Sequence, residues 1–159
     1  MDNSKKETSK NVLIVEDDML LSLVEERLIE KLGHTVIGKA GSGEEAIQKQ
    51  KELEPDLILM DIVLKGELDG IEAMKEIRKT SDVPVIYLSG NSDRYNYDRA
   101  KQTEFTDYLV KPISSRDLIG PLNKAFITES DQANQADSNQ ERSIKNLNSQ
   151  NGHIINKSA

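Results

Sequence analysis

Short apolar runs of this chain end in side chains that could bind or transfer a phosphoryl group. These side chains are, in chain order, Glu16 and Asp17, Asp61, Ser89, and Lys111. If the runs are parallel strands of one open sheet, their carboxyl ends lie along one edge, where ligands bind in such folds. Residues that are far apart in the sequence would then form one site.

Three of these side chains are acids, and acids that share a pocket repel one another. A divalent cation would relieve the repulsion, and an all-oxygen ligand set without Cys or His suits Mg²⁺ better than Zn²⁺. One carboxylate could then act as a nucleophile toward a phosphoryl group. Lys111 and the Ser89 hydroxyl would supply positive charge and hydrogen bonds to the phosphoryl oxygens. The pattern therefore predicts an aspartyl phosphate.

Each of these residues has an ordinary structural explanation when it is taken alone. An acid after a strand often caps the next helix, as Asp17 or Asp18 could. Asp61 could form a turn, residues 89–92 could be a plain loop, and Lys111 could be a solvated lysine. These explanations do not account for the shared position of the residues at the same end of four different strands.

The elements that must position these residues are visible as five short apolar runs. We expect strands at residues 12–15, 35–40, 57–60, 85–88 and 108–110. Runs of this length and apolar content are typical of strands covered on both faces. Their alternation with helical stretches implies right-handed crossovers and a doubly wound α/β sandwich. We predict a five-stranded parallel sheet of order 2-1-3-4-5, the flavodoxin-like arrangement, with its switch point between the first and third strands.

Between the strands, apolar residues recur at helical spacing, which predicts helices with one buried stripe each. The three stripes are Leu20, Val24, Leu28 and Leu32; Ala46, Ile47, Gln50 and Leu53; and Ile71, Met74 and Ile77. Ser42 with Glu45, and Asp69 with Glu72, have the spacing of an N-cap and its acid three residues on. These pairs predict where the second and third helices begin.

The last two helices are harder to predict. Residues 93–102 contain few apolar side chains but include Tyr95 and Tyr97, so this helix could present an interaction face. The fifth helix, residues 115–126, contains Gly120-Pro121 in its interior, which should kink it or divide it.

Composition indicates one ordinary domain with tails. With 159 residues, a net charge of −7 and no cluster of Lys and Arg, the chain lacks the basic face that nucleic acid binding needs. It has no long apolar run and its first ten residues are polar, so we expect a soluble, cytoplasmic protein without a membrane partner. The absence of cysteine excludes disulfides and thiolate metal sites.

Both ends of the chain are expected to be disordered. Residues 1–10 are polar, and residues 128–159 are rich in Asn, Gln and Ser with too few apolar side chains to offset the entropy of ordering. A transient helix or a short binding motif around residues 140–148 remains open. The expected domain is therefore residues 11–127.

Four segments give a specific resemblance to a known family. They are VLIVEDD at 12–18, PDLILMDI at 55–62, PVIYLSG at 84–90 and DYLVKP at 107–112. In this order and spacing they resemble the receiver domain of two-component response regulators, over essentially all of residues 11–127. The chain looks like a stand-alone, chemotaxis-regulator-like member.

The resemblance implies a role for each acid of the pocket. Asp61 would accept phosphate from a phosphohistidine of a sensor histidine kinase or a histidine phosphotransfer protein. Mg²⁺, or Mn²⁺ in its place, would be bound by Asp17, Asp61 and the backbone carbonyl of Val63, and largely through water by Glu16. Asp18, one place further on, would cap the first helix.

The resemblance also implies residues that sense the phosphoryl group. Lys111 would pair with it, Ser89 would swing to hydrogen-bond it, and Tyr108 would follow as an aromatic switch. Gly90 leaves the phosphoryl group open to approach.

Two further positions, Val63 and Asn91, would lie beside the route of an attacking water and tune the phosphoryl lifetime. An apolar Val63 cannot position water, which predicts slow self-dephosphorylation.

The sequence departs from the family pattern in the loop at residues 65–70. This loop lacks the proline that many receivers have after the acceptor and is one residue longer, so the start of the third helix is open. Ser89 replaces the more common Thr but keeps the hydroxyl.

The resemblance implies a switch that is not an enzyme beyond its own phosphorylation and dephosphorylation. The face of the fourth helix, fifth strand and fifth helix would control binding to a downstream target protein or onward phosphorelay, and the sequence does not separate these roles. There are three alternative functions: a haloacid dehalogenase-like hydrolase, a flavodoxin-like electron carrier and a receiver that binds without phosphate. The hydrolase would need Asp-x-Asp after the first strand, and the electron carrier would need a hydroxyl- and glycine-rich loop there. A receiver that binds without phosphate would not require the intact acids.

Overall fold

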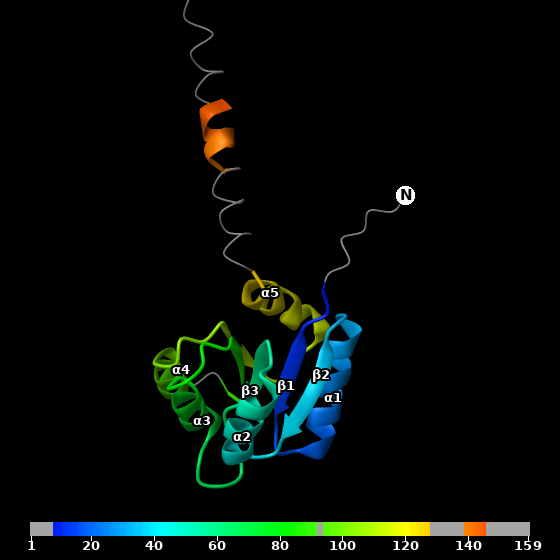
Figure 1. The fold of residues 1–159 in the computed structure, drawn as a ribbon, viewed down its shortest axis with the longest axis vertical. Coiled ribbons are helices and arrows are strands. Elements are labelled where there is room, and N and C mark those ends of the chain that lie inside the picture. Colours follow the sequence, from blue (N-terminus) through cyan, green and yellow to red (C-terminus); the bar gives the residue numbers. More distant parts are fainter. Residues whose placement is uncertain (1–7, 92–93, 128–138, 146–159) are drawn as a thin grey trace, which may run out of the picture. The chain divides into compact units, whose positions relative to one another are not determined.

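The computed structural model describes residues 8–91, 94–127 and 139–145 (Figure 1). Its sheet consists of β1 (Asn11–Val15), β2 (Thr35–Ala40), β3 (Leu57–Asp61), β4 (Val85–Ser89) and β5 (Asp107–Val110). All four neighbouring pairs are parallel and the order is β2-β1-β3-β4-β5. The predicted strands, their order and the doubly wound α/β class are confirmed.

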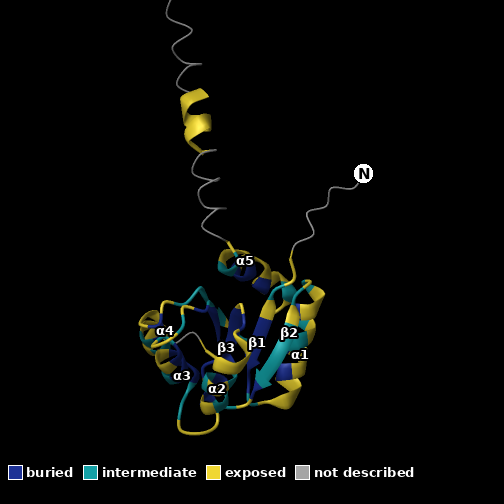
Figure 2. Cartoon of the chain, in the orientation of Figure 1, coloured by how far each residue is buried: buried dark blue, intermediate teal, exposed yellow. Residues whose placement is uncertain are grey.

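The centre of the sheet forms the hydrophobic core. All residues of β3 and β4 and all but the first of β1 are buried, because helices cover both faces of these strands (Figure 2). The outer strands β2 and β5 are mostly only half-buried. The apolar runs that predicted the strands are therefore the core itself.

Five helices connect and cover the strands. They are α1 (Met19–Lys31), α2 (Gly43–Leu53), α3 (Gly70–Ile77), α4 (Arg94–Lys101) and α5 (Ser115–Ala125). Helix α1 contacts α5 and helix α2 contacts α3. Ser42 caps α2, and Asp69 forms a full capping box with Glu72, as the spacing predicted. The long loop after β3 therefore ends at Asp69, which settles where α3 begins.

The buried face of α1 differs from the prediction. The inward residues are Ser22, Glu25 and Ile29, whereas Leu20 and Val24 of the predicted stripe are exposed. Apolar residues occupy most of the first two turns of this helix, so spacing alone did not identify the side that faces the sheet. Helix α1 consequently carries an exposed apolar surface and a buried acid.

The later helices contain one further difference. Helix α5 is undivided and runs through Pro121, which is buried together with Leu118 and Leu122. A proline removes one backbone hydrogen bond, and the packing of these side chains compensates for that loss. The predicted stripe of α3 is confirmed, because Ile71, Met74 and Ile77 are buried. The stripe of α2 is confirmed in part: Ala46 and Gln50 are buried, but Leu53 at the end of the helix is exposed.

The chain divides into two compact units, Met1–Ala125 and Phe126–Ala159. Within the second unit the structure describes a helix at residues 139–145, inside the segment where a transient helix was left open. The predicted disorder of residues 1–7, 128–138 and 146–159 lies outside the described residues and stays a prediction. Within the described ranges, none of the helices is both long and apolar enough to cross a bilayer.

Candidate functional site

Strand register brings the predicted site residues to one edge of the sheet. Val15 lies beside Met60 and Asp61 lies beside Leu88, so Glu16, which follows Val15, is level with Asp61. Ligand atoms of Glu16, Asp17 and Asp61 all lie within 4.8 Å of one another. Glu16 and Asp61 are buried and Asp17 is half-buried. The predicted acidic pocket is thus assembled from β1 and β3.

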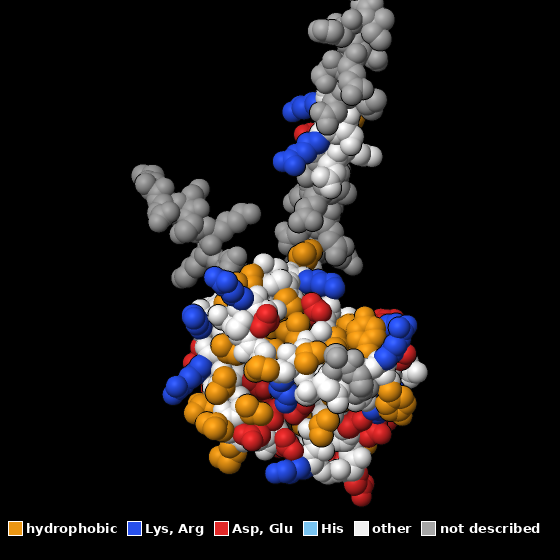
Figure 3. Space-filling model, turned by 180° about the vertical axis from the view of Figure 1, so that it is seen from behind, with side chains coloured by type: hydrophobic (Ala, Val, Ile, Leu, Met, Phe, Trp, Pro, Cys, Tyr) orange, Lys and Arg blue, Asp and Glu red, His pale blue; other side chains and the backbone are white. Residues whose placement is uncertain are grey.

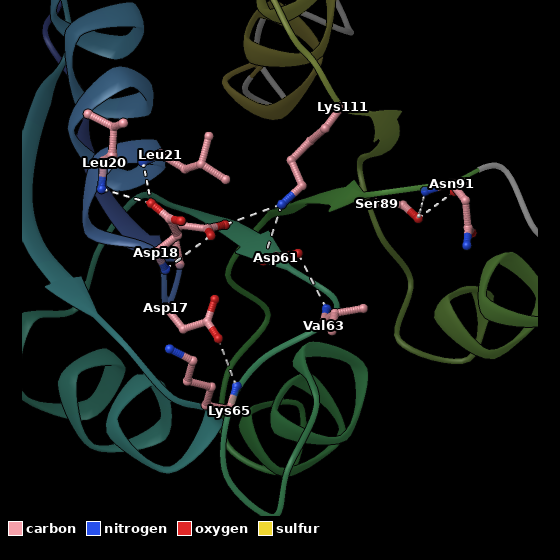
Figure 4. Close-up of polar contacts among 11 residues, drawn as sticks. Asp17, Asp18, Leu20, Leu21, Asp61, Val63, Lys65, Ser89, Asn91 and Lys111 are labelled. Carbon is pink, nitrogen blue, oxygen red and sulfur yellow. Dashed lines mark hydrogen bonds and ion pairs between the residues drawn. The ribbon is translucent and has the colours of Figure 1, made fainter.

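Lys111 reaches this pocket from the end of β5 (Figure 4). Its Nζ lies 3.2 Å from Oδ2 of Asp61 and 3.4 Å from Oε2 of Glu16. Burial by itself lowers the pKa of Lys111, but the charges of Asp61 and then Glu16 outweigh it and leave the pKa above its ordinary value. Lys111 therefore stays charged and partly neutralises two carboxylates.

Glu16 is strongly perturbed by its surroundings. Burial, followed by the hydrogen bond and the charge of Asp61, raises the pKa of Glu16 to about 7, although Lys111 opposes the shift. Apart from this shift, the pocket places three carboxylates beside one lysine, so opposite charges are not balanced there. The pocket suits an added cation.

Backbone N–H groups orient all three carboxylates. Oε1 of Glu16 accepts from the N–H of Asp18 at 3.2 Å, Oδ2 of Asp17 from that of Lys65 at 3.1 Å, and Oδ1 of Asp61 from that of Val63 at 3.3 Å. Two of these donors come from the loop after β3, so the long loop helps to build the pocket.

Asp18 is not part of the pocket. Its Oδ1 accepts the N–H groups of Leu20 and Leu21 at 2.9 and 3.0 Å, which caps α1. The expected helix cap is confirmed.

Ser89 ends β4 at the same edge but does not face Asp61. Its hydroxyl donates to the carbonyl of Asn91 and accepts the N–H of Asn91 at 3.3 Å (Figure 4). Gly90 has open space around it: a Cβ built there would meet no atom within 4 Å. Val63 is exposed. Asn91 is exposed as well, so both residues expected to tune the phosphoryl lifetime are accessible to water, and the tuning role stays a prediction.

Tyr108 belongs to an aromatic cluster under α4. Its ring centroid lies 5.3 Å from that of Tyr97, 6.0 Å from that of Phe105 and 6.3 Å from that of Tyr87. Among the described residues, its buried hydroxyl has no hydrogen-bond partner. Tyr108 thus packs inward, although its polar end is unpaired there.

Glu25 is a residue near the site that sequence reasoning missed. This residue of α1 is 4% exposed, and its pKa is raised to about 8 by burial and then by the charge of Glu16. Its Oε2 has no hydrogen-bond partner in the described part of the chain. One signal of its burial is present in the sequence. Glu25 lies three residues after Ser22 and four before Ile29, so these residues share a helix face that differs from the predicted stripe.

The donor set fits a hard divalent cation. Three carboxylates at one edge offer oxygen ligands alone, and the chain has no cysteine that could compete. Asp17, Asp61 and Glu16 are the residues that would hold the ion. The acid cluster and its paired lysine lie at the switch point of a 2-1-3-4-5 sheet, which is the arrangement expected of a receiver domain.

Comparison with known families agrees with this class. Residues 12–123 match the response regulator receiver domain, and the chain belongs to this family. Chemotaxis protein CheY of Thermotoga maritima is 36% identical over 116 residues, which are 72% of this chain and 96% of that protein. Transcriptional regulatory protein PdtaR of Mycobacterium tuberculosis is 34% identical over 73% of this chain and 56% of its own length. The chain spans about half the length of several curated relatives that it matches.

Solved structures give the same result. The signal receiver domain of a modulated diguanylate cyclase from Desulfovibrio desulfuricans G20 is 34% identical, with a TM-score of 0.69 over 74% of this chain and 94% of that one. The response regulator domain of Thermotoga maritima CheB is 28% identical, with a TM-score of 0.68 over 76% of this chain and 99% of that one. Receiver domains are signalling modules and not metabolic enzymes.

Proposed function

We propose that this chain acts as a response regulator in which Asp61 takes a phosphoryl group from a phosphohistidine of a sensor histidine kinase or a histidine phosphotransfer protein. A carboxylate oxygen of Asp61 attacks phosphorus, the P–N bond breaks, and its electron pair stays on the histidine ring. Asp17, Asp61, the Val63 carbonyl and, through water, Glu16 would hold Mg²⁺, which neutralises charge on the phosphoryl oxygens.

The observation that carries this proposal is the ion pair of Lys111 with Asp61. A cation 3.2 Å from Oδ2 lies where negative charge collects when that carboxylate becomes phosphorylated. Lys111 would then bind a phosphoryl oxygen in place of the carboxylate. Ser89 would turn from Asn91 toward the phosphoryl group, and Tyr108 would respond to that turn.

Incubation with Mg²⁺ and a small phosphodonor, followed by intact mass spectrometry, tests the proposal. The wild-type chain should gain one phosphoryl group, and Asp61→Asn should gain none because it lacks the nucleophile. Asp82→Asn, at an exposed acid outside the pocket, is the matched control and should react as the wild type does. Labelling of Asp61→Asn at the wild-type level would refute the assignment.

The donor protein would approach over the start of α1. Met19, Leu20 and Val24 are exposed there, with Leu20 at 70%, directly after the acids of β1. Figure 3 shows the acidic side chains of this face gathered around a basic one, with hydrophobic side chains beside them. A protein that brings a histidine to Asp61 must cover these neighbours, and helices with an apolar face bind such a surface.

Replacement of Leu20 separates donor binding from chemistry. We expect Leu20→Glu to slow phosphotransfer from a purified histidine kinase by roughly tenfold, as a charge at the centre of an interface typically costs. Phosphorylation by the small phosphodonor should be unchanged, because that donor makes no contact with α1. Ile119→Glu replaces a similarly exposed aliphatic residue on α5 and should affect neither reaction. Equal kinase rates for Leu20→Glu and the wild type would contradict this docking surface.

The output is expected at the face of α4, β5 and α5, through binding to a downstream target or through onward phosphotransfer. Trapping of partners with and without beryllofluoride and Mg²⁺, then assay of transfer to a histidine phosphotransfer protein, distinguishes the two roles. The exposed rings of Tyr95 and Tyr97 on α4 support this choice of face.

A further inference from the structure

Helix α4 is held to the domain by few contacts. Ala100 is its one buried residue, and Tyr97 packs edge-on against Phe105 and Tyr108 at centroid distances of 5.5 and 5.3 Å. Its ion pair with another helix is made by Arg99, whose Nη2 lies 2.7 Å from Oδ2 of Asp69 at the start of α3. The position of α4 therefore depends strongly on one arginine.

Asp69 holds two helices at once. Its Oδ1 accepts the N–H of Glu72 at 2.8 Å and caps α3, while its Oδ2 accepts from Arg99. Glu72 contacts both residues of the ion pair. Its Oε2 accepts the N–H of Asp69 at 2.9 Å, and its Oε1 lies 3.9 Å from Nη2 of Arg99. These bonds fix the Asp69 side chain relative to α3.

The start of α3 is itself fixed against the phosphoacceptor. The N–H of Gly70 donates to the carbonyl of Ile62 at 2.8 Å. A Cβ on Gly70 would lie 2.1 Å from the carbonyl oxygen of Asp61, so the two backbones are in direct contact. Arg99 thus ties α4 to a rigid point next to Asp61.

The N-terminal end of α4 lies close in sequence to Ser89. Among the described residues, the Ser89 hydroxyl donates to the carbonyl of Asn91 and accepts the N–H of Asn91, three residues before α4 begins at Arg94. On the proposed function, Ser89 gives up these bonds to reach the phosphoryl group. The backbone at Asn91 would then shift, and α4, which begins three residues later, would shift with it unless Arg99 holds the helix in place.

We propose that the Arg99–Asp69 ion pair is a latch that holds α4 in its unphosphorylated position and opens on phosphorylation. This inference rests on the proposed function. Both side chains are mostly shielded from solvent, at 21% and 27% exposed, which makes the pair stronger than a surface ion pair. An ion pair that forms only in the unphosphorylated conformation stabilises that conformation. It therefore lowers the affinity of Asp61 for a phosphoryl group, which favours the other conformation.

Affinity for beryllofluoride in the presence of Mg²⁺ measures the effect of the latch. Beryllofluoride stands for the phosphoryl group on Asp61, and its binding can be followed by calorimetry. Arg99→Ala should bind it roughly tenfold more tightly than the wild type, the factor expected for one charge-assisted hydrogen bond. Without beryllofluoride, amide hydrogen exchange in residues 94–101 should be faster in Arg99→Ala, because α4 has lost its link to α3.

Three variants make the test specific to the pair. Arg94→Ala removes an arginine from the same helix, but this side chain is 88% exposed and its ion pair among the described residues is within α4, with Asp98 at 3.9 Å, so affinity should not change. Asp69→Asn keeps a capping oxygen and loses the charge, and should act in the same direction as Arg99→Ala. Arg99→Lys keeps the charge but not the planar fork that reaches both Asp69 and Asn96, and should be intermediate.

Each outcome is decisive. Unchanged or weaker beryllofluoride affinity in Arg99→Ala, in a protein with the circular dichroism spectrum of the wild type, would overturn the latch while the proposed function stands. A tighter affinity of equal size in Arg94→Ala would also overturn it. Failure of the wild type to bind beryllofluoride with Mg²⁺ would overturn the proposed function, and the latch with it.

Discussion

At the scale of single residues, Asp61 has a donor on each carboxylate oxygen. Oδ1 accepts the N–H of Val63 and Oδ2 pairs with Lys111. These donors hold the carboxylate in one orientation before any phosphodonor arrives, which lowers the entropy lost on the way to the transition state. The sequence predicted Asp61 and Lys111 because both follow apolar runs. It could not predict which oxygen faces which donor.

Glu25 provides a pH-dependent prediction. Burial and the charge of Glu16 raise its pKa from 4.5 to about 8, so the folded chain keeps a proton that the unfolded chain releases near pH 4.5. Between these values the native state binds more protons, and the free energy of unfolding falls as pH rises. The stabilisation that the native state gains by keeping Glu25 protonated is complete below pH 4.5 and is lost as the pH rises to about 8.

Urea unfolding of the wild type and of Glu25→Gln between pH 5 and pH 8.5 measures the effect. The wild type should lose stability relative to Glu25→Gln by roughly 2–4 kcal/mol across this range, since one pKa unit corresponds to about 1.4 kcal/mol. The other acids are common to both proteins and largely cancel. A pH-independent difference would show that Glu25 titrates normally.

At the scale of elements, the loop after β3 and the start of α3 explain why Gly70 is required. Its backbone touches the Asp61 carbonyl, and no side chain fits between them. The capping pair Asp69 and Glu72 was readable from the sequence because its spacing is local. The contact of Gly70 with Asp61 and the ion pair of Asp69 with Arg99 were not, because they join residues whose approach only the fold determines.

Alanine substitution of Gly70 and of Gly120 compares a glycine in a crowded site with a glycine in an open site. Gly70→Ala should destabilise the domain by roughly 2–4 kcal/mol, because its Cβ would force backbone apart in a packed site. Gly120→Ala in α5 meets no atom within 4 Å and should stabilise it by about 0.5–1 kcal/mol through helix propensity. Thermal unfolding of both variants gives the comparison. Equal effects would mean that the Asp61 contact is not tight.

Helix α1 shows where element prediction from periodicity is limited. The sequence placed this helix correctly, since Asp18 caps it and the strands on either side are clear. The predicted buried face of α1 was wrong, because apolar side chains cover nearly every side of its first turns. They are Met19, Leu20, Leu21, Leu23 and Val24. Packing against the sheet selected the side with Ser22, Glu25 and Ile29 instead.

At the scale of the whole molecule, the core lies within the predicted domain. The buried cluster runs from Leu13 on β1 to Ala100 on α4, and Leu118 and Leu122 add α5. The first compact unit ends at Ala125, close to the predicted boundary at Ile127. The boundary at Ile127 was predicted from composition alone, because apolar side chains become rare after it, and it stays a prediction.

Truncation tests the domain assignment. A chain that ends at Ile127 should unfold within a few degrees of the full-length midpoint and should be phosphorylated by the small phosphodonor at a similar rate, because the core and the acids are retained. A chain that ends at Ile113 loses the buried Leu118, Pro121 and Leu122 and should fail to fold cooperatively. Loss of folding in the longer truncation would place part of the domain beyond Ile127.

The unpaired hydroxyl of Tyr108 has an energetic consequence for the switch role proposed for this residue. A phenol removed from water without a partner costs about 1–3 kcal/mol, and in the described part of the chain this hydroxyl finds none. Its ring contacts gain a comparable amount from the surrounding aromatics. On the proposed function, an outward rotamer would return this hydroxyl to water, and that gain would offset part of the ring contacts that the rotation gives up.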